Sequence, residues 1–216
     1  MSDMQLRQDV LDELEYEPSL NAAHIGVLAE GGVITLTGFV HNYAHKLAAE
    51  AAARRVKGVK AIADEIDVRY PSEEKTSDDQ IAKRALDILA WDVLVPKSGI
   101  QVTVSNGRVT LGGTVDWYYE KKAAEEDVRK LSGVVGVFNK IEIKPPAKAE
   151  NVKKKIEEAL KRHAEVEAEG IRITVRENDN VLIEGKVDNW DERRAVEAAA
   201  WSAPGVRVVE NQLAIG

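Results

Sequence analysis

The stretch Gly107-Arg108-Val109-Thr110-Leu111-Gly112-Gly113-Thr114-Val115 decides the fold. It alternates apolar and polar residues, as a strand with one buried face does, and it follows Asn106, so that an Asn-Gly hairpin turn precedes it. The same pattern occurs at residues 34–40 as Ile-Thr-Leu-Thr-Gly-Phe-Val and at residues 181–187 as Val-Leu-Ile-Glu-Gly-Lys-Val. The chain therefore contains three copies of one unit.

Each copy has a second glycine twenty residues after the glycine of this strand. The pairs are Gly38 with Gly58, Gly113 with Gly133, and Gly185 with Gly205. Glycine is the residue that accepts positive φ without steric cost. We therefore expect all six to shape the backbone, the second of each pair just after a helix that ends there.

The segments around each strand predict the order helix, strand, strand, helix, strand. A stripe at i, i+4, i+8 opens each copy, as Leu6, Val10 and Leu14 do in the first, and alanine-rich helical segments follow the second strands. First strands are expected at 25–27, 100–104 and 171–175, and third strands at 66–68, 141–143 and 213–215. The predicted fold class is α+β, with three tandem αββαβ modules at 1–70, 78–144 and 150–216. Each would have a three-stranded mixed sheet with both helices on one face.

The overall composition excludes several classes of protein. The chain has 216 residues, 44% hydrophobic and 31% charged, which is typical of a globular protein, and no apolar run approaches the roughly 20 residues of a membrane span. It has no cysteine, which excludes disulfides and thiolate chemistry. The net charge of −7, with both signs interleaved, argues against nucleic acid as a partner.

The three copies resemble the BON domain, the module named for bacterial osmotically inducible and nodulation proteins. The resemblance rests on the amphipathic helix, the hairpin V-x-L-x-G-x-V, the alanine-rich helix and the later Gly-Val. An Asn or Asp then stands six residues beyond that glycine, at Asp64, Asn139 and Asn211. It implies a non-enzymatic module that binds phospholipid or other envelope components and is linked to osmotic or envelope stress. The family has no agreed functional residues to carry over.

An aromatic corner, where each second strand turns into a helix, is the candidate binding site. It consists of Tyr43, Trp117, Tyr118, Tyr119 and Trp190, with the basic residues Lys121, Lys122, Arg193 and Arg194 beside them. Aromatic rings favour the boundary between a lipid bilayer and water, so these residues are candidates for binding a ligand or a membrane. The alternative is that Tyr43, Tyr118 and Trp190 close one end of each core or pack against a neighbouring module. Trp91 and Trp201 lie in helices and are expected to be buried.

No constellation in the sequence predicts catalysis, a cofactor or a metal. His41 and His45 have the i, i+4 spacing of a ligand pair but no third ligand nearby, and the other copies have acidic residues there that suit a helix start. The acidic pairs are typical of solvated helix faces rather than of a general acid and base in one cleft. We therefore expect no enzyme activity.

Two hypotheses for function remain. In the first, a tandem interaction protein engages phospholipid or an envelope-associated surface, with avidity from repetition. In the second, a self-assembling or protein-binding, chaperone-like stress protein pairs with partners along open sheet edges. The N-terminus, Met1-Ser2-Asp3-Met4, enters a helical pattern without a signal peptide. This predicts a cytoplasmic location, or a periplasmic one if a leader was removed.

Overall fold

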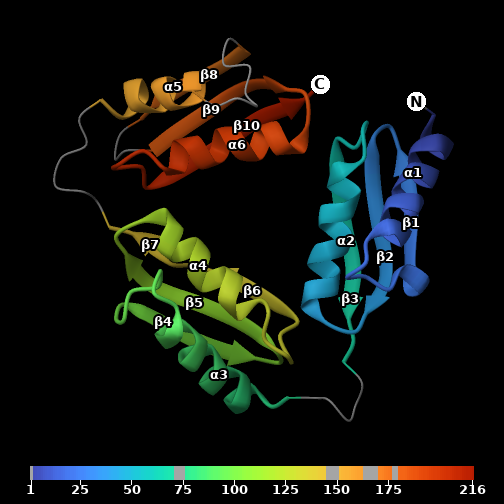
Figure 1. Cartoon of the computed structure of the whole chain (residues 1–216), viewed down its shortest axis with the longest axis horizontal. Coiled ribbons are helices and arrows are strands. Elements are labelled where there is room, and N and C mark those ends of the chain that lie inside the picture. Colours follow the sequence, from blue (N-terminus) through green and yellow to red (C-terminus); the bar gives the residue numbers. More distant parts are fainter. Residues whose placement is uncertain (1, 71–75, 145–150, 163–169, 177–179) are drawn as a thin grey trace. The chain divides into compact units, whose positions relative to one another are not determined.

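The structure is a computed structural model that describes residues 2–70, 76–144, 151–162, 170–176 and 180–216 (Figure 1). By its contacts the chain divides into two compact units. One comprises residues 1–97, 101–112 and 123–140, the other 98–100, 113–122 and 141–216, so the second sequence repeat contributes to both. The fold is the predicted mixed α and β arrangement, with the same order of elements three times.

Repeat 1 shows the complete order of elements. It consists of α1 (Asp3–Tyr16), the short 3-10 helix η1 (Ala22–His24), β1 (Ile25–Glu30), β2 (Val33–Val40), α2 (Tyr43–Arg55) and β3 (Ala61–Val68). Repeat 2 has α3 (Asp78–Trp91), β4 (Ile100–Ser105), β5 (Arg108–Val115), α4 (Tyr118–Val128), β6 (Gly136–Asn139) and β7 (Glu142–Ile143). Repeat 3 has α5 (Val152–Arg162), β8 (Ile171–Val175), β9 (Asn180–Val187), α6 (Trp190–Trp201) and β10 (Val208–Ile215).

Each sheet is mixed, with the repeated strand at its centre. β1 pairs antiparallel with β2 and β3 pairs parallel with it, so that Leu36 faces both Val27 and Asp64. Repeat 3 has the same topology, with β9 between β8 and β10. In repeat 2 the third strand is interrupted, and β6 and β7 each pair parallel with β5. All three third strands begin earlier than predicted, because parallel pairing supplies hydrogen bonds along most of the central strand.

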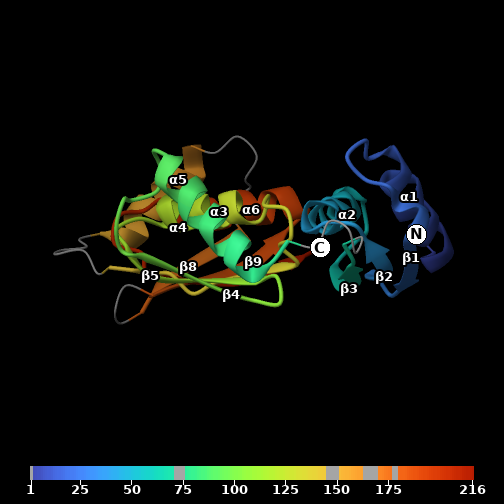
Figure 2. The same ribbon diagram turned by 90° about the horizontal axis from the view of Figure 1, so that it is seen from below.

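The apolar stripes predicted on the first helices are buried. Val10 and Leu14 in repeat 1, like Ile81 in repeat 2 and Ile156 in repeat 3, have no exposed surface. In repeat 1 they join one cluster with alternate residues of β2 and with Ala49, Ala52 and Ala53 of α2. The small alanine side chains allow α2 to lie close to the sheet. Figure 2 shows α3 and α4 on one side of β4 and β5, as the stripes require.

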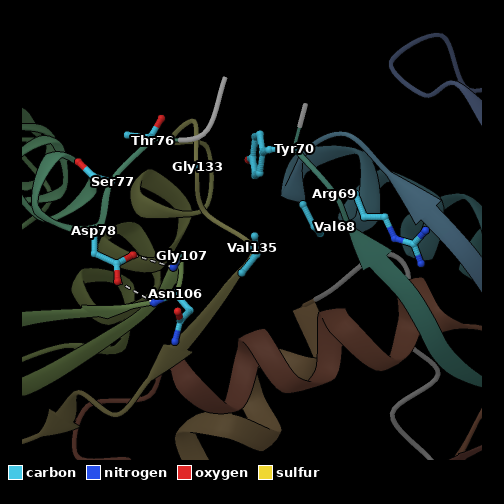
Figure 3. Close-up of a pocket in the computed structure, with 10 residues that line it drawn as sticks. All are labelled: Val68, Arg69, Tyr70, Thr76, Ser77, Asp78, Asn106, Gly107, Gly133 and Val135. Atoms are coloured by element: carbon cyan, nitrogen blue, oxygen red, sulfur yellow. Dashed lines mark hydrogen bonds between the residues drawn. The ribbon is translucent and has the colours of Figure 1, made fainter. Parts of the chain in front are cut away.

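The first helix of a repeat also holds the hairpin turn through its first carboxylate. In repeat 2, the backbone N–H groups of Asn106 and Gly107 donate to the two oxygens of Asp78, at 2.7 and 2.8 Å (Figure 3). In repeat 1, Gly31 N donates to Asp3 Oδ1 at 3.0 Å. Gly31 and Gly32 in repeat 1 and Asn106 and Gly107 in repeat 2 have positive φ, which suits the Asn-Gly turn predicted for repeat 2. In repeat 3, residues 178 and 179 between the two strands lie outside the described residues.

The glycine within each central strand is a point of close backbone approach. Gly113 has a φ of 105°, and a Cβ there would overlap the carbonyl oxygen of Gly99, the residue before β4. The same oxygen accepts a hydrogen bond from Thr114 N at 3.0 Å. Gly38 and Gly185 also have positive φ and approach the carbonyl oxygens of His24 and Gly170 in the same way. A side chain here would both strain the backbone and separate the two strands.

The prediction that the second helices end at Gly58, Gly133 and Gly205 was wrong in detail. The helices end earlier, at Arg55, Val128 and Trp201. The glycines have φ of 94°, 90° and 102° and lie in the turns that lead from helix to third strand. The segments between the predicted modules, 71–77 and 145–149, lie largely outside the described residues, which include only 76 and 77 of them.

Replacing Gly113 by alanine tests this constraint, and the neighbouring Gly112 provides a matched control. A Cβ on Gly112 would meet no described atom within 4 Å, and no positive φ is recorded there. We expect Gly113→Ala to lower the free energy of unfolding by clearly more than about 1 kcal/mol, since it combines strain with a backbone clash. Gly112→Ala should change it by less than about half as much. Urea denaturation followed by tryptophan emission measures both, and equal effects would contradict the proposed role of Gly113.

Candidate functional site

The aromatic corner is built on helix starts that the sequence specifies. Asn42 and Asn189 are N-caps whose side chains accept hydrogen bonds from His45 N and Glu192 N, both at 2.8 Å. In repeat 2, Glu120 accepts instead from the backbone N–H groups of Asp116 and Trp117, at 2.9 and 3.0 Å. The polar residues at these positions therefore satisfy the free N–H groups of a helix N-terminus.

The five aromatic candidates fall into two groups. Trp117 and Tyr119 are exposed, whereas Tyr43, Tyr118 and Trp190 are half-buried. Burial raises the pKa of the Tyr43 phenol. Tyr118 stacks on Trp201, with ring centroids 4.1 Å apart and planes inclined by 6°. The side chains of Tyr43, Tyr118 and Trp190 are thus partly withdrawn from solvent. Trp117 and Tyr119, which are 44% and 52% exposed, are the two exposed aromatic residues of the five.

Some of the basic candidates have intramolecular partners. The guanidinium of Arg193 lies 5.3 Å from the centre of the Trp190 ring and donates to the carbonyl oxygen of Asn211 at 3.4 Å. Arg194 forms an ion pair with Asp191. Lys121 is half-buried, and Lys122 is exposed. A headgroup that competed for Arg193 would have to displace contacts within the repeat.

Arg193 belongs to a polar junction between the second helix and the third strand, at the Asn or Asp noted in each repeat. Asn139 donates to Glu125 and Asn211 donates to Glu197, both at 3.0 Å. Asp64, which cannot donate when ionised, is instead 3.3 Å from the ammonium group of Lys46. This junction gives the Asn or Asp a structural role in each repeat.

The structure also exposes a surface that the sequence interpretation missed. Trp91, the last residue of α3, is 86% exposed, so the expectation that it is buried was wrong. Val93 and Leu94, in the following loop, are 95% and 53% exposed. We call Trp91, Val93 and Leu94 the apolar tip. Trp201, the other tryptophan expected to be buried, is half-buried.

The signal for the apolar tip was present in the helical periodicity. The buried stripe of α3 ends at Leu89, and Trp91 follows it by two residues, which places it about 200° around the helix and away from the core. The matching residue of repeat 1, Tyr16, is 79% exposed, whereas that of repeat 3 is Arg162. Val95 is buried and fixes the end of the loop to the core.

The described part of the chain contains neither a cluster of metal ligands nor a helix that could span a membrane. Among these residues, no group of three or more His, Asp or Glu side chains is placed to hold a metal ion. His41 Nδ1 is 3.3 Å from the carbonyl oxygen of Arg69, and His45 is half-buried. No described helix has both the length and the apolar character to cross a bilayer.

Comparison with known proteins identifies the repeats. The model of the BON domain matches residues 2–70, 77–145 and 148–216. Osmotically-inducible protein Y of Escherichia coli (strain K12) is 29% identical over 153 residues, which cover 67% of this chain and 74% of that protein. A structure of CdsD, a structural protein of the Type III secretion system of Chlamydia trachomatis, aligns over 98% of this chain and 92% of its own. Its sequence identity is 16% and its TM-score 0.27, too low to support an inference.

A change in the polar junction tests its electrostatics. We expect Asn211→Asp to lower the free energy of unfolding by about 1 kcal/mol at pH 7, since it loses a hydrogen bond and places a carboxylate against Glu197. Two carboxylates repel each other only when both are ionised. The part of the stability loss due to repulsion is therefore absent below about pH 4 and appears as the pH rises.

The control for this experiment is Asn211→Ala, which removes the hydrogen bond without adding charge. Urea denaturation by circular dichroism between about pH 4 and pH 7 should show a pH-dependent difference between the two variants. A constant difference would contradict the assignment of Glu197 as the neighbour that matters.

Proposed function

Because the chain belongs to the BON domain family, with three copies along its length, we propose that it is a non-enzymatic binding protein that inserts the apolar tip of repeat 2 into a phospholipid bilayer surface. The observation that carries this proposal is the exposure of Trp91, Val93 and Leu94 within four consecutive residues. A rigid helix end presents them, and a buried Val95 holds the loop.

The energetics of such an insertion favour weak, reversible binding. Full burial of a large apolar side chain is worth about 1.5–3 kcal/mol, so three partly inserted side chains contribute a few kcal/mol. Tryptophan in particular favours the interfacial region of a bilayer. Tyr16 offers a second aromatic contact at the matching position of repeat 1, and a second contact increases the effective affinity through avidity.

The charge near the tip favours apolar insertion over headgroup capture. Asp87 and Asp92 are the nearest charged residues on either side of Trp91, and the net charge of the chain is −7. Such acidic surroundings do not attract anionic headgroups. Binding should therefore tolerate salt, unlike binding by the cationic residues Lys121 and Lys122 of the aromatic corner.

The name of the Escherichia coli relative describes that protein as osmotically inducible. We extend this to a stress-related role for the present chain, as the family resemblance implies. Contact with a lipid surface through separate small modules suits such a role, since each contact is reversible while the set of repeats raises the overall affinity.

Flotation with phosphatidylcholine vesicles tests the lipid proposal. We expect the wild-type chain to bind, and the triple variant Trp91→Ser/Val93→Ser/Leu94→Ser to bind at least tenfold more weakly, because it loses most of the inserted apolar surface. Binding should persist at about 0.5 M NaCl, where surface charges are screened. The control is Trp117→Ala, which leaves the tip intact.

Equal binding of the triple variant and the wild-type chain would contradict the proposal. Loss of binding in salt and in Lys121→Ala/Lys122→Ala would assign binding to the aromatic corner instead.

Exposed apolar residues on edge strands favour a second candidate function, association with a protein chain by strand addition. Leu28 on β1 and Phe138 on β6 are exposed, and each strand lies at the edge of its sheet. Such edges are templates for another strand. We expect sedimentation velocity to show self-association that increases with protein concentration. The substitution Leu28→Lys should weaken this association. Sedimentation as a monomer at all concentrations would contradict self-association.

A further inference from the structure

In repeat 1, a side chain of the first helix covers part of the outer edge of the first strand. Nε of Arg7, on α1, donates a hydrogen bond to the carbonyl oxygen of Val27, on β1, at 2.9 Å. β1 lies at the edge of its sheet, and an edge strand directs every second carbonyl and N–H group away from the sheet. Arg7 therefore occupies one of the backbone acceptors that an added strand would use.

The third strands of repeats 1 and 3 have similar protection. Ile66 N donates to Asp64 Oδ1 at 3.0 Å, and Lys46 Nζ donates to the carbonyl oxygen of Ile66 at 2.6 Å. In repeat 3, Leu213 N donates to Asn211 Oδ1 at 3.1 Å. These strands also lie at sheet edges. Side chains that satisfy edge backbone groups in this way hinder pairing with another strand.

The first strand of repeat 2, β4, has a different neighbour on its helix. The residue of α3 that matches Arg7 is Ala82, and its methyl group cannot donate a hydrogen bond. Val102 matches Val27, so its carbonyl oxygen is also directed away from the sheet. Val27 is buried, whereas Val102 is half-buried. The edge of β4 is thus more accessible than that of β1.

Repeat 3 has charged residues at the same two places on its first helix. Lys153 matches Ala82, and it lies 3.7 Å from Glu157, which matches Leu86. The strand residue that matches Val102 is Ile173, and it is buried. Repeat 2 is therefore the repeat in which this side of the first helix is apolar and the strand beside it is partly uncovered.

These differences leave apolar surface along α3 and β4 of repeat 2. We call Ala82, Leu86, Val102 and Val104 the open seam. Leu86 is one helical turn beyond Ala82 and is 55% exposed, whereas its counterpart in repeat 1, Leu11, packs against the core. β4 itself, Ile-Gln-Val-Thr-Val-Ser at residues 100–105, has no charged residue and is rich in residues that favour strands.

We propose that the open seam binds an extended, uncharged segment of a partner protein, which adds to β4 as a further strand. The backbone of the segment pairs with the outward groups of Val102 and Val104, and every second side chain meets Ala82 and Leu86. Apolar residues suit these positions, because a charged side chain would lose water there without gaining a partner. The inference does not depend on the lipid function proposed above.

The position of α3 favours an isolated segment over a second copy of the chain. α3 lies on one side of β4 (Figure 2). In a two-fold pairing of β4 with β4, both copies of α3 would lie on the same side of the joined sheet. Neighbouring strands are about 4.8 Å apart, whereas packed helices need about 8–10 Å between their axes. An isolated segment brings no helix and avoids this conflict.

Titration of the full chain with a synthetic peptide tests the proposal. The probe is Thr-Ile-Thr-Val-Thr-Val with blocked ends, which is uncharged and has alternate apolar residues. We expect the amide NMR resonances of Val102 and Val104 to shift as the peptide binds. The same peptide with proline in place of its first valine lacks one backbone donor and should bind at least about tenfold more weakly.

The protein variant Ala82→Arg copies the protection found in repeat 1. We expect it to bind the peptide at least about tenfold more weakly than the wild-type chain, because the arginine covers the edge of β4. The matched control is Gln80→Arg. It adds the same side chain about 200° away around α3 and should bind as the wild-type chain does.

Equal peptide binding by Ala82→Arg and the wild-type chain, or no shift of the Val102 and Val104 amides, overturns the proposal. Dimers of the wild-type chain that Ala82→Arg abolishes would assign the seam to a second copy and overturn it too. If Ala82→Arg fails to fold, equal binding of the two peptides by the wild-type chain is the contradicting result. The triple variant of the apolar tip should bind the peptide normally, so failure of the lipid function is distinguishable.

Discussion

Every repeat depends on one close approach between two segments of backbone. The central strand can lie this close to the start of its hairpin partner only at a residue that has no side chain and adopts a positive φ. The three repeats have Gly38, Gly113 and Gly185 there. That contact sets the register of the hairpin, and the register determines which side of the central strand faces the helices. The buried cluster of Ile34, Leu36 and the α2 alanines in repeat 1 follows from it.

Polar contacts then fix the helices relative to this sheet. The first helix reaches the hairpin turn through Asp3 or Asp78, and the second reaches the third strand through Lys46, Glu125 or Glu197. The repeats keep these positions but change the chemistry, as when Asp64 replaces asparagine and its partner becomes a lysine. A small domain buries little apolar surface, so such junctions matter to its stability.

Because residues at equivalent positions differ between the repeats, one repeat can have a surface that the others lack. The loop between the first helix and first strand joins the core through few residues, and in repeat 2 it carries Trp91, Val93 and Leu94. The loop of repeat 1 is held at the same place by the ion pair between Arg55 and Glu17. Repetition of the fold thus does not imply repetition of the same surface in each repeat.

The sequence by itself determined the three repeats, the order of elements, the mixed sheets and the positions of the glycines with positive φ, because each depends on periodicity or on residues a few positions apart. Only the tertiary structure decided which aromatic residues are withdrawn and which are exposed, since a ring such as Tyr118 or Trp91 is buried or not according to what packs against its helix face.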